Sequence, residues 1–204
     1  IADAAHARGI EVMIDGAHTF GHFAFDIPSL GGDYYGTSLH KWMSAPIGSG
    51  MLWIKKDKIS KIWPLMPGDQ PQSEDIRKFE NLGTRSFPIE QAIGQAVDFH
   101  MMIGPERKEA RLRYLKDYWT SKVKDLPGVF LNTSLLPAYS CAIANIGVEG
   151  REPVDLDNHL FSKYNIHCVT INWENIHGVR IAPHVYTSLR ELDRLVEGIT
   201  SFVA

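Results

Sequence analysis

The chain has 204 residues, of which 44% are hydrophobic and 22% charged, a composition typical of globular proteins rather than of disordered chains or coiled coils. The 21 basic and 24 acidic residues give a formal net charge of −3, which argues against a dedicated nucleic-acid-binding protein, because such proteins need a basic surplus. Apolar runs fall far short of the roughly 18 residues of a membrane span, and two cysteines are too few for a disulfide framework and indicate a reducing, cytoplasmic compartment.

The first part of the chain predicts the helix and strand alternation of a parallel α/β sheet. Alanines at helical spacing in residues 2–9 predict a helix that stops at Gly9. A short apolar strand then ends in Asp15, and a tight turn is expected over 44–50. A long loop containing three prolines is expected over 63–85. The strands are expected at 10–15, 34–37 and 50–54.

Two helices follow, separated by a helix-breaking Gly-Pro pair. Pro88 begins the first helix, and Gly104-Pro105 ends it and begins the second, so we expect a domain boundary at 104–106. The second helix has one apolar face. Its other face mixes basic and acidic side chains, including Lys108 and Lys116, and is typical of a helix surface exposed to solvent.

The C-terminal part predicts short strands and helices in a small α+β domain. A helix is expected over 154–164, and a last helix is expected to begin at Ser188 and Glu191, which have the spacing of a capping box. The strands are expected at 140–146, 166–171 and 179–182.

Polar side chains suited to catalysis follow two of the predicted strands. Asp15 ends one strand, and Ser38, His40 and Lys41 end the next. Ligands of open α/β sheets bind beyond the carboxyl ends of the strands, so we expect these side chains at one site. A partly desolvated lysine amine is a usable nucleophile toward carbonyls. An acid and an amine at neighbouring strand ends suit pyridoxal 5′-phosphate (PLP), because the acid keeps the pyridine nitrogen protonated and the lysine forms a Schiff base.

The amino-acid sequence of these segments resembles that of the class V aminotransferase family of PLP enzymes. The segments Ile14–His18, Ser38–Lys41 and Gly48–Leu52 carry the resemblance. Within the family the chain is most similar to the isopenicillin N epimerase-like branch, through Leu82–Arg85 and Val179–Tyr186. The resemblance covers the whole chain, and it implies an α/β architecture of fold type I, the aspartate aminotransferase fold.

The resemblance also implies how the chain is organised. Residues 1–104 would be the C-terminal part of a PLP-binding large domain with a mainly parallel sheet, including the loop 63–85 and a linking helix. Residues 105–204 would be a small C-terminal α+β domain. On this interpretation the chain is the C-terminal half of a longer subunit, and the ring-stacking aromatic residue and any targeting signal lie in the other half.

Five residues would bind the cofactor if the resemblance holds at each position. Lys41 would form the Schiff base with PLP and move the proton at the substrate α carbon. Asp15 would pair with the pyridine nitrogen, and His18 would approach the phenolic oxygen of the ring. Ser38 and His40 would bind the phosphate.

Three further residues would complete the site. Gly83 and Thr84 would reach the phosphate bound by the neighbouring subunit, which implies a homodimer with shared active sites. Arg180 would bind the α-carboxylate of an amino-acid substrate through its planar fork of donors. The implied function is a PLP-dependent enzyme, an aminotransferase or an epimerase-like enzyme, acting at the α carbon of an amino acid.

The alternative within this chemistry is a PLP-dependent carbon–sulfur lyase or a cysteine desulfurase-like enzyme. A desulfurase needs a cysteine thiolate on a mobile loop near the substrate. The stretch 172–178, just before Arg180, contains no cysteine, and Cys141 and Cys168 fall in predicted strands. Elimination that needs no cysteine remains open.

Two alternatives come from other classes of protein. His18 and His22 have the i, i+4 spacing of metal-binding histidines, which suggests a metal-dependent hydrolase. Gly21 and Pro28 argue against the helix that this spacing needs. A binding module without catalytic activity is the other alternative, and the context of Lys41 argues against it.

Overall fold

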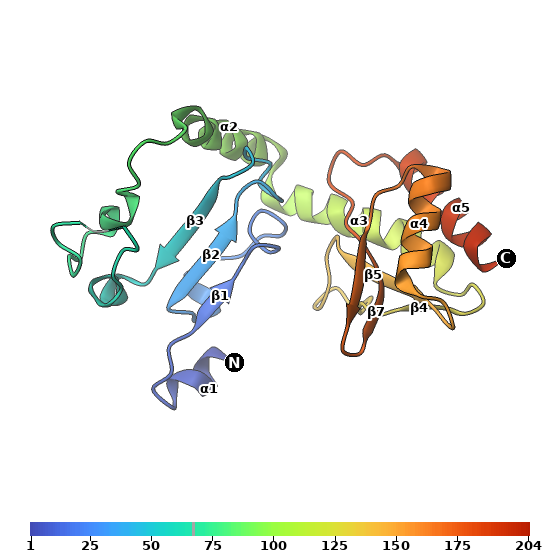
Figure 1. Ribbon diagram of the computed structural model, residues 1–204, viewed down its shortest axis with the longest axis horizontal. Coiled ribbons are helices and arrows are strands. Elements are labelled where there is room, and N and C mark those ends of the chain that lie inside the picture. The colour runs from blue at the N-terminus through green and yellow to red at the C-terminus, as the bar shows by residue number, and fades with distance from the viewer. Residues whose placement is uncertain (67) are drawn as a thin grey trace. The chain divides into compact units, whose positions relative to one another are not determined.

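The chain forms two compact units, residues 1–105 and 106–204, each with its own sheet (Figure 1). The structure is a computed structural model that describes residues 1–66 and 68–204. Pro67, one of the three prolines of the expected loop, lies outside the described residues. No helix within 1–66 or 68–204 is long and apolar enough to cross a lipid bilayer.

The sheet of the first unit has the strand order β1-β2-β3: β1 (Met13–Asp15), β2 (Tyr34–Ser38) and β3 (Gly50–Ile54). β1 and β2 are parallel, with Asp15 opposite Gly36. β3 is antiparallel to β2, because the tight turn between them reverses the chain. This three-stranded sheet is therefore mixed, with one parallel and one antiparallel pair, whereas the mainly parallel sheet is expected of a whole large domain.

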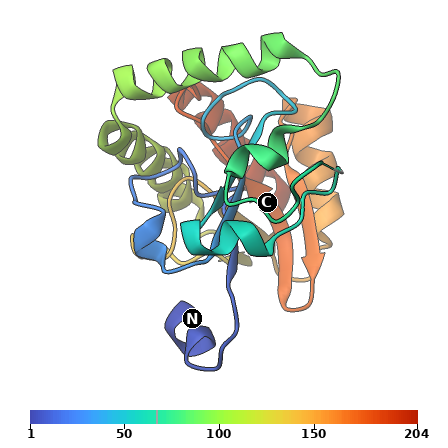
Figure 2. The ribbon, with the colours of Figure 1, turned by 90° about the vertical axis from the view of Figure 1, so that its left-hand side faces the viewer.

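One helix precedes the strands of this sheet in the chain, and another follows them. α1 (Ala2–His6) precedes β1, and α2 (Phe87–Ile103) lies beyond the opposite end of the sheet (Figure 2). The described residues of this unit also form three short 3-10 helices: η1 (Pro28–Leu30), η2 (Lys56–Lys61) and η3 (Ile76–Glu80). The expected long loop therefore contains η3, which begins where the Asp75 carboxylate accepts a hydrogen bond from the backbone N–H of Arg77.

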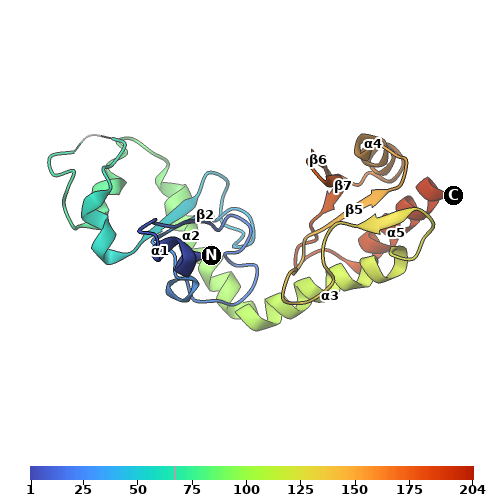
Figure 3. The ribbon, with the colours of Figure 1, turned by 90° about the horizontal axis from the view of Figure 1, so that it is seen from below.

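The second unit is a four-stranded antiparallel sheet, of order β4-β5-β7-β6, with helices packed on one face (Figure 3). Its elements are α3 (Pro105–Val123), β4 (Val129–Leu131), β5 (Ala144–Val148), α4 (Pro153–Tyr164), β6 (Val169–Trp173), β7 (Ile176–Ile181) and α5 (Leu189–Val203). The core joins side chains of α3, α4 and α5 to Ile146 of β5 and Val179 of β7. The capping box predicted at Ser188 and Glu191 is present.

The polar face of α3 is exposed at Glu106, Arg107 and Asp117 but buried at Lys108 and Lys116, so the prediction of a solvent-exposed face was wrong for these two lysines. Lys108 and Lys116 are each 1% exposed. Lys116 Nζ donates a hydrogen bond to Ser140 Oγ at 2.8 Å, and Arg113 donates to the backbone carbonyls of Pro137 and Ser140. The face therefore holds the connection between β4 and β5, while burial lowers the pKa of Lys108 to about 8.

Candidate active site

The first strand ends in a carboxylate and then turns over a glycine. The N–H of Gly16 donates to the carbonyl of Gly36 at 2.7 Å, and its own carbonyl accepts hydrogen bonds from the Thr37 and Thr19 hydroxyls at 3.0 and 3.1 Å. A Cβ at Gly16 would lie 2.0 Å from Cζ of Tyr35, so the turn excludes larger residues. This turn fixes the backbone on which Asp15 stands.

Tyr35 supports the turn from the interior of the unit. Its side chain is 0% exposed, and its hydroxyl lies 2.7 Å from Oγ1 of Thr19. Burial raises the pKa of Tyr35, and the nearby carboxylate of Asp15 adds to the effect. Asp15 itself is exposed, and Oδ1 accepts a hydrogen bond from the backbone N–H of Ala17 at 3.0 Å.

Lys41 lies in the turn that follows β2 and contacts the turn that follows β1. Its Nζ is 3.3 Å from Nε2 of His18, and within the described residues no carboxylate pairs with it. The turn is held by the N–H of Leu39, which donates to the carbonyl of Ser49 at 3.1 Å. Lys41 is half-buried, so its amine is presented at the carboxyl ends of two parallel strands without an ion pair.

Trp42 determines which nitrogen of His18 faces Lys41. Its indole Nε1 donates to Nδ1 of His18 at 3.4 Å. An indole N–H can only donate, so Nδ1 is the acceptor and a neutral His18 carries its proton on Nε2. That N–H points to Nζ of Lys41, and the contact is a hydrogen bond when the amine is uncharged.

His22 completes this cluster as a packing partner of Trp42. The two rings stack with centroids 4.0 Å apart and planes 9° apart, and Nδ1 of His22 lies 2.9 Å from the carbonyl oxygen of His18. Residues 18–22 form turns rather than the helix that a metal-binding i, i+4 pair needs. Among the described residues, no three His, Cys, Asp or Glu side chains are placed to hold a metal ion.

Ser38 and His40, the expected phosphate ligands, flank the same turn. Ser38 ends β2, and across residues 1–66 and 68–204 its hydroxyl has no hydrogen-bond partner. His40 is exposed, with Nδ1 3.4 Å from the carbonyl oxygen of Ser49. The tight Gly48 turn, with φ of +91°, brings Ser49 back beside them. The arrangement offers a hydroxyl and an imidazole to an anion.

Gly83 and Thr84 lie on the exposed loop between η3 and α2. The φ of Gly83 is +67°, and a Cβ there would meet nothing within 4 Å. Their neighbours Leu82 and Arg85 line a cavity of about 890 Å³ that also borders Thr37 of β2. The loop is therefore open to a ligand or to another chain.

Arg180 lies in the second unit, on β7, opposite Asn145 of β5 and Val169 of β6. Its Nε is enclosed and has no hydrogen-bond acceptor among residues 1–66 and 68–204. No carboxylate of the described residues lies within ion-pair distance of it. An enclosed donor without an acceptor is costly, so this guanidinium is suited to an anion that comes from outside the unit.

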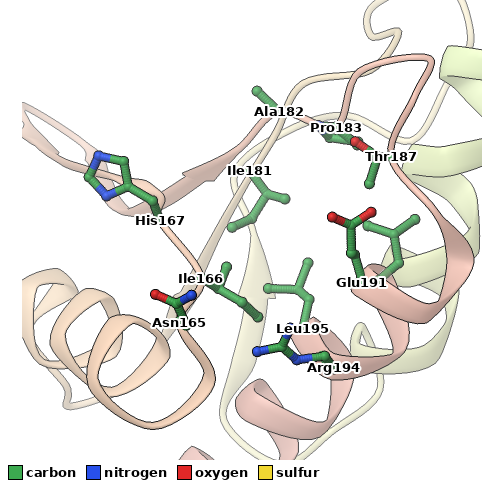
Figure 4. A pocket seen from close by; sticks show the side chains of 11 residues that line it. Asn165, Ile166, His167, Ile181, Ala182, Pro183, Thr187, Glu191, Arg194 and Leu195 are labelled. Carbon is green, nitrogen blue, oxygen red and sulfur yellow. The ribbon is translucent and has the colours of Figure 1, made fainter.

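A cavity of about 260 Å³ beside the end of β7 has a different character (Figure 4). Ile166, Ile181 and Leu195 supply apolar walls. Its charged side chains have structural roles: Glu191 belongs to the capping box, and Arg194 donates to the carbonyl of Tyr164. Both charged side chains are therefore engaged in structural hydrogen bonds.

Comparison with known proteins shows the family of this chain. The sequence profile described as "Aminotransferase class-V" matches residues 1–195. The chain belongs to the aminotransferase class-V family. It is 28% identical to isopenicillin N epimerase from Streptomyces clavuligerus, over 98% of this chain and 54% of that protein. It is 27% identical to a probable cysteine desulfurase from Halalkalibacterium halodurans, over 98% and 52%. The chain thus spans about half the length of these curated relatives.

Solved structures give the same fold. Cysteine desulfurase from Thermococcus onnurineus NA1 matches with a TM-score of 0.82 and 23% identity, over 99% of this chain and 55% of that chain. A C-DES variant with glycine covalently linked to its PLP cofactor matches with a TM-score of 0.79 and 21% identity, over 94% and 51%. The family and the fold type I architecture expected from the sequence are confirmed.

The structure also adds residues that the sequence reasoning missed. Trp42 directly follows Lys41, yet nothing in the sequence indicates that it bonds to His18. The spacing of His22 from His18 suggests a metal ligand, whereas in the structure His22 stacks on Trp42. Tyr35 and Gly16 form a matched pair whose only signal in the sequence is a glycine at the end of a strand.

Proposed function

We propose that this chain is part of a PLP-dependent enzyme that acts at the α carbon of an amino acid, as an aminotransferase or an epimerase-like enzyme. The half-buried amine of Lys41, which faces an imidazole and has no carboxylate partner in the described residues, carries this proposal. When bound, PLP supplies an electron sink for the α carbon. The relatives of this chain that are named as epimerase, desulfurase and lyase support the assignment.

The donor set fits the cofactor group by group. Lys41 would hold PLP covalently, and the exposed carboxylate of Asp15 would pair with the protonated pyridine nitrogen. The imidazole of His18 would approach the phenolic oxygen. Ser38 and His40 would donate to the phosphate, for which their hydroxyl and imidazole are suited.

The protein's own residues would then bind the substrate and move the proton. Arg180, with its enclosed and unsatisfied Nε, would bind the α-carboxylate. Lys41, once its amine is released, would take the α proton, and His18 would hold that amine in place through Nε2. Residues 1–104 would supply the cofactor site as part of a large domain, and residues 105–204 would supply Arg180 as a small domain.

Two further proposals concern assembly and location. Gly83 and Thr84 lie on an open loop, and we assign them to the phosphate of a neighbouring subunit in a homodimer with shared sites. The two free, buried cysteines are in keeping with a cytoplasmic protein.

A carbon–sulfur lyase is the second candidate, because the relatives include proteins named as a hercynylcysteine sulfoxide lyase and as a probable cysteine desulfurase. The lysine-based steps are shared with it, and elimination of a sulfur leaving group needs no cysteine. A desulfurase that uses a thiol of this chain is disfavoured, because the segment 172–178 before Arg180 is a tight hairpin without cysteine.

The test uses the full-length protein with Lys41→Ala, and Lys56→Ala as a matched control at an exposed lysine of the same unit. After borohydride reduction in the presence of PLP, mass spectrometry should find the cofactor on the peptide of Lys41 in the control and on no peptide of Lys41→Ala. Reduction that still attaches PLP elsewhere with full activity would refute the proposal. Keto acid, racemised amino acid and sulfide, measured over one panel of amino acids, distinguish the candidate reactions.

A further inference from the structure

We propose that Asn145 forms, together with Arg180, the subsite that binds the carboxylate of the substrate. This inference rests on the proposed function and deepens it, since it assigns a second binding residue to the same carboxylate. It draws on the second unit alone.

The sheet places the two side chains next to each other. Asn145 of β5 is directly opposite Arg180 of β7 in an antiparallel pair. Directly opposite residues project from the same face of a sheet, with Cβ atoms about 5 Å apart. The next pair, Ile146 and Val179, is fully buried in the core on the helix-covered face. By alternation, Asn145 and Arg180 belong to the other face.

Both side chains have an enclosed donor with no acceptor. Asn145 is 7% exposed, and its Nδ2 has no hydrogen-bond partner in the part of the chain that the structure describes. Nε of Arg180 is in the same situation. Native proteins satisfy nearly all of their buried donors, so two unsatisfied donors on facing residues indicate a missing acceptor.

The hydrogen bonds around Asn145 fix which atom of its amide is the donor. Nδ2 of Asn132 donates to the carbonyl of His177 at 3.0 Å and to Oδ1 of Asn145 at 2.7 Å. A backbone carbonyl only accepts, so the Asn132 atom is its nitrogen and the Asn145 atom that faces it is oxygen. The NH₂ group of Asn145 is therefore the group that remains without a partner.

A glycine leaves the space for this amide. A Cβ at Gly178 would lie 2.5 Å from Oδ1 of Asn145 and 2.3 Å from the carbonyl oxygen of Ile146. Gly178 precedes Val179 and Arg180 on β7, so the amide of Asn145 lies over the strand that carries the guanidinium.

A carboxylate fits this pair of donors. It has two oxygens that accept hydrogen bonds, no donor, and a single charge that the one guanidinium balances. An amide N–H and a guanidinium N–H from adjacent strands would each bind an oxygen of the same planar group. The pair is thus suited to the α-carboxylate of an amino acid.

The decisive variant is Asn145→Asp, which has almost the same shape and keeps an oxygen for Asn132. It would supply Arg180 with an internal carboxylate and repel that of the substrate. We expect KM for the amino acid to rise about tenfold or more, because a charge-assisted contact is replaced by repulsion, with a smaller change in kcat. Asn158→Asp, at an exposed position of α4, is the matched control and should leave KM unchanged.

A second measurement needs neither cofactor nor turnover. Acetate should raise the thermal unfolding midpoint of the cofactor-free wild-type protein and of Asn158→Asp, compared with chloride at equal ionic strength, and should not raise that of Asn145→Asp. If Asn145 only holds Asn132, the aspartate variant will keep the acetate effect and the wild-type KM, and the proposal is overturned. If Lys41→Ala retains activity while the acetate effect behaves as expected, the proposed function fails and the carboxylate subsite stands.

Discussion

Gly16→Ala should destabilise the first unit and weaken the candidate site together. The new Cβ would lie 2.0 Å from Cζ, 2.1 Å from the hydroxyl and 2.5 Å from Cε2 of Tyr35. Tyr35 is fully buried and cannot rotate into solvent. Overpacking of this kind costs about 1–3 kcal/mol, and displacement of the hydroxyl from Thr19 costs about 1 kcal/mol more. We therefore expect a loss of about 2–4 kcal/mol.

Chemical denaturation, followed by tryptophan fluorescence, measures this loss in the full-length protein. Gly94→Ala is the matched control, because a Cβ there meets nothing within 4 Å and alanine favours the α2 helix by about 0.5–1 kcal/mol. In a Tyr35→Leu background the penalty of Gly16→Ala should shrink, since the ring that it strikes is gone. Equal stability of the two alanine variants, or an undiminished penalty in the Tyr35→Leu background, would refute the packing argument.

Two further predictions concern charge and hydrogen bonding. Asp33 accepts hydrogen bonds from the backbone N–H of Val12 and from the ring of His6, and these contacts lower its pKa from 3.8 to about 2. The ionised carboxylate therefore contributes stability that is present above about pH 4 and is lost as the pH falls toward 2. In urea titrations, Asp33→Asn should lower the free energy of unfolding at neutral pH and flatten its pH dependence between about pH 4 and 2. Trp42→Phe keeps the ring stack on His22 but removes the N–H that holds His18, so Nε2 of His18 is no longer fixed toward Nζ of Lys41. Acylation of Lys41 in the cofactor-free protein, measured by peptide mass spectrometry at mildly alkaline pH, should then slow roughly fivefold. Trp63→Phe is the control and should leave the rate unchanged.

Local chemistry explains why much of the fold could be predicted. The capping box at Ser188 and the break at Gly104 each depend on residues within one helical turn, and the structure has both. The first helix ends at His6, earlier than expected, although Gly9 does take the left-handed conformation. The polar residues that follow β1 and β2 were also visible, because the period of a strand and the position of its end can be read from apolar residues. Family resemblance then supplied roles that spacing alone cannot give.

Contacts between distant segments explain what could not be predicted. Trp42 and His18 are 24 residues apart, and only the parallel pairing of β1 with β2 brings their turns together. Lys108 and Lys116 have the spacing of an exposed helix face, yet both are buried, and Lys116 donates a hydrogen bond to Ser140 of the connection that follows β4. Asn145 is one polar residue in an otherwise apolar strand, and its significance depends on which residue of β7 lies opposite.

The β6–β7 hairpin bears most directly on the type of reaction. Pairing continues to Trp173 opposite Ile176, so only two residues connect the strands, and Glu174 takes a left-handed conformation with φ of +47°. Such a hairpin cannot carry a thiol on a mobile loop toward the substrate. The two cysteines, which lie elsewhere in the chain, are poor nucleophiles. Burial raises the pKa of Cys141 to about 11, and burial together with a hydrogen bond to the carboxylate of Asp157 also raises the pKa of Cys168. On the proposed function, the reaction would therefore use the amine of Lys41, and neither Cys141 nor Cys168 would serve as a nucleophile.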